Sequence, residues 1–400
     1  MLWLLLACAK DTPVDSIPGV TVDLTAPPWV LITGSNSALL RFETLNQDVE
    51  LPVELILGTA EPMTRIPARS SLQTDYAFPP VQANPDLQYQ DLPGVRVLHQ
   101  LELSDLVPGQ HVGWRVDLGA GEFVEGSFRI PGPGQDFVAV FTGDTMFPKL
   151  DQVVERAAPF APDLYLHGGD LQYQSNPFDT WTGLMHSIAP LTAQAPFHPA
   201  VGNHEYEGQD EFGVMFERFF EGAGDANQGT AYHAFSAGGV RFIALNSEGE
   251  HGLGDGESPQ VQWLTLELIE HADAPVVVYF HRPIITLAEH DPELSMRAVL
   301  HPLFVGHGVD LVLTAHNHSY ERFEMDQVPY VVDGGGGAFL YSATVHEADY
   351  PEDLARRQAV DKSMGFTVLR FGPQGIDLER YDIDGEQVDA ALLPYRELPD

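Results

Sequence analysis

The stretch Leu166–Tyr173 reads LHGGDLQY and continues an apolar run that starts at Leu164. Such a run followed by glycines predicts a buried strand that presents polar side chains at its carboxyl end, where open α/β sheets place their sites. Asp170 and Tyr173 would be two of these polar side chains. Taken alone, the same stretch also fits a Gly-Gly-Asp turn followed by a packed tyrosine.

Four other apolar runs end in the same way. The polar residues that follow them are Asp144 after Phe137–Thr142, Asn203-His204-Glu205 after Phe197–Val201, His281 after Val276–Phe280, and His316-Asn317-His318 after Val309–Thr314. Five successive strand ends thus present Asp, Asp, Asn, His and a His-x-His pair. Chance rarely produces this order, so the pattern indicates a site at one edge of a sheet.

Composition limits the class of partner. The 400 residues include 58 acidic and 20 basic side chains, a formal net charge of −38. Phosphates would be repelled at long range, which argues against a protein that binds duplex nucleic acid. An anionic substrate would need local positive charge, and bound metal ions can supply it. Otherwise the acidic excess is typical of a solvated surface.

Two domains are predicted, and the fold class is α/β. Residues 26–131 contain short strands separated by Gly, Pro, Asn and Asp, which predicts an all-β sandwich. Its segment 101–118 resembles the late strands of a fibronectin type III domain. Beyond the linker Pro131-Gly132-Pro133-Gly134, strands and helices alternate, which predicts a layered α/β domain over residues 135–395. Its helices are expected at 148–158, 178–191, 209–220, 261–272 and 293–304.

The first ten residues, MLWLLLACAK, resemble a bacterial lipoprotein signal in which Cys8 becomes lipidated. The basic segment that usually opens such a signal is missing, and an unmodified cysteine is the alternative. Residues 1–25 are therefore predicted to be a signal and tether. The expected location is secreted or at the cell envelope, with membrane contact only through a lipid anchor at Cys8.

The motifs together resemble the calcineurin-like metallophosphoesterases, and specifically the purple acid phosphatase branch. The similarity runs from about residue 137 to 337 in the order GD, GDxxY, GNHE, an apolar run ending in His, and HxHxYER. The preceding sandwich resembles the N-terminal domain of the larger purple acid phosphatases. Met146 stands where the general superfamily has a histidine, but the purple branch also lacks it and has a tyrosine at the position of Tyr173. Ala315 replaces the usual glycine before the His-x-His pair.

The resemblance implies two metal sites that share Asp170. One metal would take Asp144, Asp170, Tyr173 and His318, and the other would take Asp170, Asn203, His281 and His316. Anionic oxygens, phenolate above all, suit Fe(III), and the second set suits a divalent Zn, Fe or Mn ion. His204 would contact phosphate or the leaving group. His290, in the loop 284–291, would be the general acid, or else a solvent-exposed loop histidine.

The implied activity is hydrolysis of small phosphomonoesters to an alcohol and inorganic phosphate, by direct attack of a metal-bound hydroxide. One alternative is a phosphodiesterase that uses the same centre. The other is a surface-anchored binding protein with a vestigial site. Arg282 is expected either to face the substrate or to be structural, and Arg322 is expected to pair with Glu321 beneath the His-x-His loop.

Overall fold

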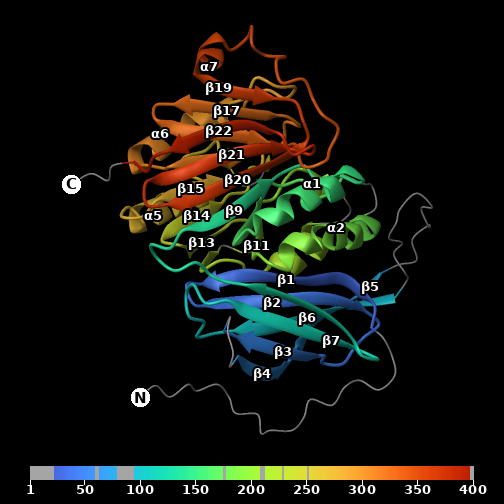
Figure 1. The fold of residues 1–400 in the computed structure, drawn as a ribbon. Helices are drawn as coiled ribbons and strands as arrows, with labels where there is room; N and C mark the ends of the chain where they lie inside the picture. The colour runs from blue at the N-terminus through green and yellow to red at the C-terminus, as the bar shows by residue number, and fades with distance from the viewer. Residues whose placement is uncertain are drawn as a thin grey trace.

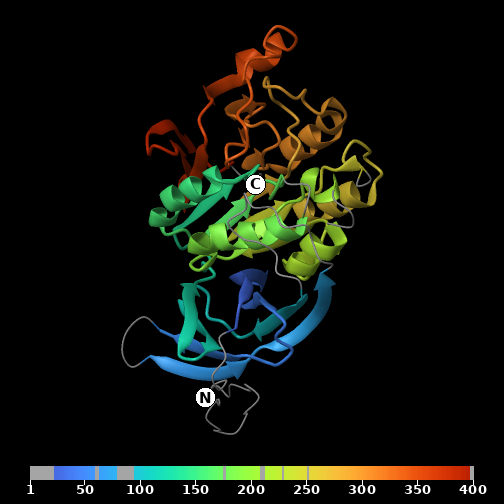
Figure 2. The same cartoon turned by 90° about the vertical axis from the view of Figure 1, so that its right-hand side faces the viewer.

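The structure is a computed structural model, and it describes residues 22–58, 63–78, 94–173, 177–207, 212–227, 229–249 and 252–396. An N-terminal β-sandwich lies below a larger α/β region (Figures 1 and 2). Cys8 and the rest of the predicted signal up to residue 21 lie outside the described residues.

The sandwich consists of two antiparallel sheets with the strand orders β1-β2-β6-β5 and β4-β3-β7-β8. The strands are β1 (Leu24–Gly34), β2 (Ser37–Leu45), β3 (Pro52–Leu57), β4 (Thr64–Arg69), β5 (Ser71–Phe78), β6 (Gly94–Leu103), β7 (Val112–Gly119) and β8 (Glu122–Phe128). In β7 the buried residues alternate with partly exposed ones, as a strand with one face on a core requires.

Two sheets form the centre of the α/β region, with the strand orders β11-β10-β9-β20-β21-β22 and β12-β13-β14-β15-β16-β18-β17-β19. The first contains β9 (Phe137–Thr142), β10 (Leu164–His167), β11 (Phe197–Pro199), β20 (Gly365–Gly372), β21 (Gly375–Asp382) and β22 (Gln387–Leu393). The second contains β12 (Ala226–Asn227), β13 (His233–Ala237), β14 (Val240–Ala244), β15 (Val276–Tyr279), β16 (Leu311–Thr314), β17 (Tyr320–Met325), β18 (Val328–Asp333) and β19 (Arg357–Asp361). Strands β9, β10 and β11 are parallel, as are β14, β15, β16 and β18.

Helices cover the outer faces of both sheets. The helices are α1 (Lys149–Ala157), α2 (Pro177–Thr192), α3 (His204–Glu207), α4 (Arg218–Phe220), α5 (Pro259–Glu270), α6 (Leu294–His307) and α7 (Pro351–Arg356). One face of β9 packs with α1 and α2 in one hydrophobic cluster, and one face of β15 packs with α5 and α6 in another. The opposite faces of β9 and β15 share a third cluster, so the sheets stack face to face between helical layers.

Sandwich and α/β region are joined by a buried interface. Trp29 of β1 is fully buried and its ring lies 5.0 Å from that of Phe219. Within the same interface, Arg41 Nη1 donates to the carbonyl oxygen of Phe219 over 2.9 Å. Strand β1 is therefore buried almost throughout, because it faces the sandwich core on one side and α2 on the other.

The predicted fold class is confirmed. Four of the five predicted helices are present as α1, α2, α5 and α6, with ends within three residues of those expected. The fifth, predicted at 209–220, is instead a π-helical segment, Phe212–Glu217, followed by α4, and residues 209–211 lie outside the described residues. None of the described helices combines the length and apolarity that a bilayer span requires.

Candidate metal centre

Polar residues gather where the parallel strands of both sheets end. Asp144 follows β9, Asp170 follows β10, and His316 follows β16. All three have positive φ angles, of 57°, 54° and 68° respectively. Non-glycine residues rarely adopt this conformation, and it concentrates at functional sites where the surroundings enforce it. The backbone turns sharply at each strand end, and the side chains turn inward.

One group of donor atoms surrounds the phenol of Tyr173. Its oxygen lies 2.5 Å from Asp144 Oδ1, 3.0 Å from Asp170 Oδ2 and 2.8 Å from His318 Nε2. His318 Nε2 in turn lies 3.3 Å from Asp144 Oδ1. These four side chains are the set that the family resemblance implies for one metal.

A second group surrounds the imidazole of His281. Its Nε2 lies 3.2 Å from Asp170 Oδ2, 3.1 Å from Asn203 Oδ1 and 3.1 Å from His316 Nδ1. Asp170, His281 and His316 are buried, and one ligand atom from each lies within 4.8 Å of the others. This is the set predicted for the other metal, and Asp170 belongs to both groups.

The remaining atoms of these side chains are held by the backbone. Asp144 Oδ2 accepts the His316 N–H over 2.7 Å, and Asp170 Oδ1 accepts the His204 N–H over 2.9 Å. His281 Nδ1 donates to Gly168 O over 3.0 Å, and likewise His318 Nδ1 donates to Phe339 O over 2.6 Å.

In each of these four side chains one polar atom is bonded to the backbone. The second oxygen of each carboxylate and the Nε2 atom of each imidazole therefore face the centre. Ligand orientation by such outer partners is typical of metal sites. The donor set therefore fits two metal ions that share one carboxylate.

The pKa shifts in the centre also indicate a site that attracts positive charge. Burial lowers the pKa of His281, but the carboxylates of Asp170 and Asp144 outweigh it and raise that pKa to about 10. Burial lowers the pKa of His318 as well, but the hydrogen bond to Asp144 and the charge of that carboxylate outweigh it and raise that pKa. Burial and the two carboxylates raise the pKa of the Tyr173 phenol well above its ordinary value. Protons thus collect around the carboxylates, at positions where a bound cation would displace them.

His204 and His290 flank the two groups. His204 Nε2 lies 3.8 Å from Asp170 Oδ2, and its ring lies 4.1 Å from that of Tyr173. The ring of His290 is solvent-exposed but stacks on His316 at 4.3 Å. Both imidazoles are therefore next to predicted metal ligands, on the solvent side of the centre.

Glu205 was not singled out from the sequence, although it is the last residue of the GNHE motif. Its buried carboxylate accepts the N–H groups of Asp170, Leu171 and Gly202 over 3.0, 2.9 and 2.7 Å. The Glu205 side chain thereby links the loop that follows β10 to the loop that follows β11. These bonds set the separation between Asp170 and Asn203.

The loop over the centre is fixed by Asn317, between the two histidines of the His-x-His pair. Its Oδ1 accepts the His290 N–H over 2.9 Å, and its Nδ2 donates to the His290 carbonyl oxygen over 3.0 Å. The ring of Tyr341 stacks on His318 at 3.9 Å. The sequence offers no local signal for Tyr341, because the contact depends on a distant loop.

The two arginines have different roles. Arg282 lies 3.2 Å from His316 Nε2, and Glu248 holds its Nε over 2.9 Å, so it borders the centre in a fixed orientation. The predicted pairing of Arg322 with Glu321 is wrong. Arg322 binds Asp389 of β22, whereas Glu321 accepts from Thr286 and from the Leu287 N–H, because these two neighbours along β17 point to opposite faces.

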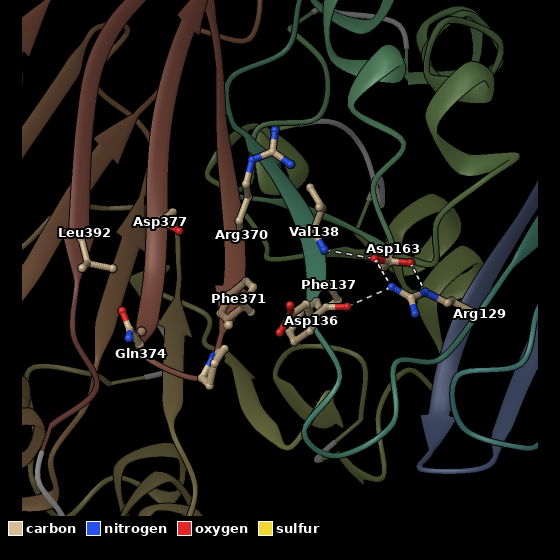
Figure 3. Close-up of a pocket in the computed structure, with 13 residues that line it drawn as sticks. Arg129, Asp136, Phe137, Val138, Asp163, Arg370, Phe371, Gln374, Asp377 and Leu392 are labelled. Carbon is tan, nitrogen blue, oxygen red and sulfur yellow. Dashed lines mark hydrogen bonds and ion pairs between the residues drawn. The ribbon is translucent and has the colours of Figure 1, made fainter.

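A separate cleft of about 480 Å³ lies at the end of the first sheet where β9 begins (Figure 3). Its lining includes Phe137, the first residue of β9, and the ion pair between Arg129 and Asp163. Asp144 follows the opposite end of β9. The cleft is therefore distinct from the candidate metal centre.

Comparison with known proteins places this geometry in a family context. Residues 137–320 match the calcineurin-like phosphoesterase family. Purple acid phosphatase 13 of Arabidopsis thaliana is 34% identical over 179 residues, 40% of this chain and 32% of that protein. Probable inactive purple acid phosphatase 9 of the same plant is 27% identical over 203 residues, 42% of this chain and 31% of that protein. The match spans about a third of the length of these curated relatives.

The fold is similar beyond the matched segment. The structure of a purple acid phosphatase from yellow lupin seeds superposes with a TM-score of 0.72 at 19% identity, over 91% of this chain and 73% of that one. The chain therefore contains a calcineurin-like metallophosphoesterase domain with purple acid phosphatase relatives, as its motifs predicted. The family match and the curated relatives support a hydrolase.

Proposed function

We propose that this protein hydrolyses phosphomonoesters to an alcohol and inorganic phosphate at a centre of two metal ions. One observation carries the proposal. Donor atoms of seven side chains converge from five strand ends, on Asp144, Asp170, Tyr173, Asn203, His281, His316 and His318. Backbone groups hold the other atoms of four of them.

In this proposal Asp144, Tyr173 and His318 would hold one ion, Asn203, His281 and His316 would hold the other, and Asp170 would belong to both sets of ligands. The carboxylate and phenol oxygens suit Fe(III), and the imidazole and amide donors suit a divalent Zn, Fe or Mn ion. When bound, two such ions acidify water and neutralise phosphoryl oxygens. They would also offset the repulsion between an anionic ester and a chain of net charge −38.

The other residues then act on the ester. His204, beside Asp170, would donate an N–H to a phosphoryl oxygen. His290, stacked on His316 and exposed to solvent, would donate a proton to the oxygen of the departing alcohol. Asn317 keeps His290 over the centre through bonds to both its backbone groups.

We also propose that Cys8 carries a lipid and that the protein works at the cell envelope. The support is the sequence MLWLLLACAK. Mass spectrometry of the mature N-terminus in a bacterial host would show a lipidated Cys8 if this proposal holds, and an unmodified Met1 or Cys8 if it fails.

The activity is tested by hydrolysis of an aryl phosphomonoester and its diester, side by side, with metal content measured in the same samples. We expect monoester turnover that is lost in Asn203→Ala and His281→Ala and retained in His271→Ala, a matched change at the end of α5. Predominant diester turnover would instead indicate a phosphodiesterase. Absence of turnover with both metals bound would favour a binding protein.

A further inference from the structure

Two large apolar side chains lie in solvent in the loop that follows β18, beyond the run Gly334–Gly337. Phe339 is 73% exposed and Leu340 is 40% exposed. Among the large hydrophobic residues that the structure describes, Phe339 is the most exposed. Removing such surface from water is favourable, and exposed apolar groups that cluster at a site often mark a binding surface.

The backbone of this segment is bonded to the metal centre. Phe339 O accepts the Nδ1–H of His318 over 2.6 Å, and the Tyr341 N–H donates to His318 O over 2.9 Å. The Ala338 N–H donates to the carbonyl oxygen of Asp144 over 3.1 Å. Residues 338–341 are therefore fixed beside two predicted metal ligands, and Phe339 and Leu340 are held at the rim of the centre.

The rim and the centre differ in chemistry. The centre is built of carboxylates, imidazoles and a phenol. The rim segment adds apolar surface, and the ring of Tyr341 packs on His318 and lies 5.3 Å, edge-on, from that of His290. If the phosphate of an ester lay at the predicted ligands and its alcohol oxygen faced His290, the alcohol part would lie near Tyr341, because the ring of Tyr341 lies beside that of His290.

We propose that Phe339 and Leu340 contact the alcohol part of the substrate, so that the enzyme favours phosphate esters of alcohols with an alkyl chain or aromatic ring over esters of small polar alcohols. This inference rests on the proposed phosphatase activity. It assigns a substrate class to the centre, and it gives a role to a segment that no motif in the sequence marks.

The test is kcat/KM for a series of n-alkyl phosphates from methyl to hexyl. A fully buried methylene group is worth about a fourfold change, so a surface that covers one side of the chain should give about twofold per methylene. Phe339→Ala keeps the carbonyl that accepts from His318, and it should reduce the increment to about 1.3-fold or less. The double change of Phe339 and Leu340 to alanine should abolish it.

Leu266→Ala is the matched control, because Leu266 is 65% exposed on α5. Dissociation constants of n-alkylphosphonates, measured by calorimetry, should show the same increments without turnover. The inference would be overturned if the increment per methylene were absent in the wild type or unchanged in the double variant. The proposed function would still stand in that case, provided that the wild type hydrolysed aryl phosphate. If the metal-loaded wild type did not hydrolyse aryl phosphate, both the inference and the proposed function would be overturned.

Discussion

Replacing Glu205 by glutamine tests whether this buried carboxylate sets the geometry of the metal centre. The wild-type carboxylate accepts three backbone N–H groups from the two loops that carry Asp170 and Asn203. A glutamine side chain has one acceptor oxygen, so its amino group would face at least one backbone donor. A hydrogen bond to a charged group is worth about 1.5–3 kcal/mol, and an unsatisfied buried donor costs a similar amount.

We therefore expect Glu205→Gln to destabilise the protein by about 3 kcal/mol. For domains of this size, that corresponds to a fall of about 6–12 °C in Tm. Because the carboxylate also positions a predicted metal ligand, metal affinity should fall by about tenfold to a hundredfold. The assays are differential scanning calorimetry and competition with a chelator.

Glu155→Gln is the matched control, because it removes one negative charge from an exposed position on α1. The control should match the wild type in both assays. If Glu205→Gln had the same Tm and the same metal affinity as the Glu155→Gln control, Glu205 would not organise the centre. That result would refute the structural argument.

Three further outcomes are expected. Tyr173→Phe should lower the bound metal from two ions per chain to about one, by elemental analysis, because the phenol belongs to one of the two donor groups. Asn317→Ala should reduce kcat about tenfold while elemental analysis shows unchanged metal, because His290 loses both bonds that hold its backbone. Burial lowers the pKa of His99 from 6.5 to about 4, so the unfolded chain takes up a proton that the folded state refuses, and stability falls as pH drops from about 6.5 to 4. His99→Gln should make Tm less dependent on pH across that window, and an unchanged slope would contradict this assignment.

Much of the centre could be predicted from the sequence because its ligands sit at fixed offsets from buried strands. Phe137–Thr142 forms β9 over the predicted residues, and Asp144 lies two residues beyond its end. Apolar runs and glycine turns are local features, and the carboxyl ends of parallel strands meet at one edge of a sheet. Residues that follow successive parallel strands can therefore be expected to lie close together in the folded protein.

Contacts between distant segments could not be predicted in the same way. The bond from His318 to Phe339 depends on how the loop after β18 folds back, and the sequence holds no periodicity that fixes it. Arg322 pairs with Asp389 because β22 approaches β17 across the stacked sheets. The predicted helix at 209–220 became a π-helical segment and α4, and Phe219 there packs against Trp29 of the sandwich. Tertiary packing decided each of these cases.

The central claim is that one carboxylate, Asp170, bridges two metal ions. Anomalous X-ray scattering from crystals of the metal-loaded protein tests it most directly. We predict two peaks that flank Asp170 Oδ2, one next to Tyr173 and His318 and the other next to His281 and His316. A single peak, or two peaks located away from Asp170, would contradict the account.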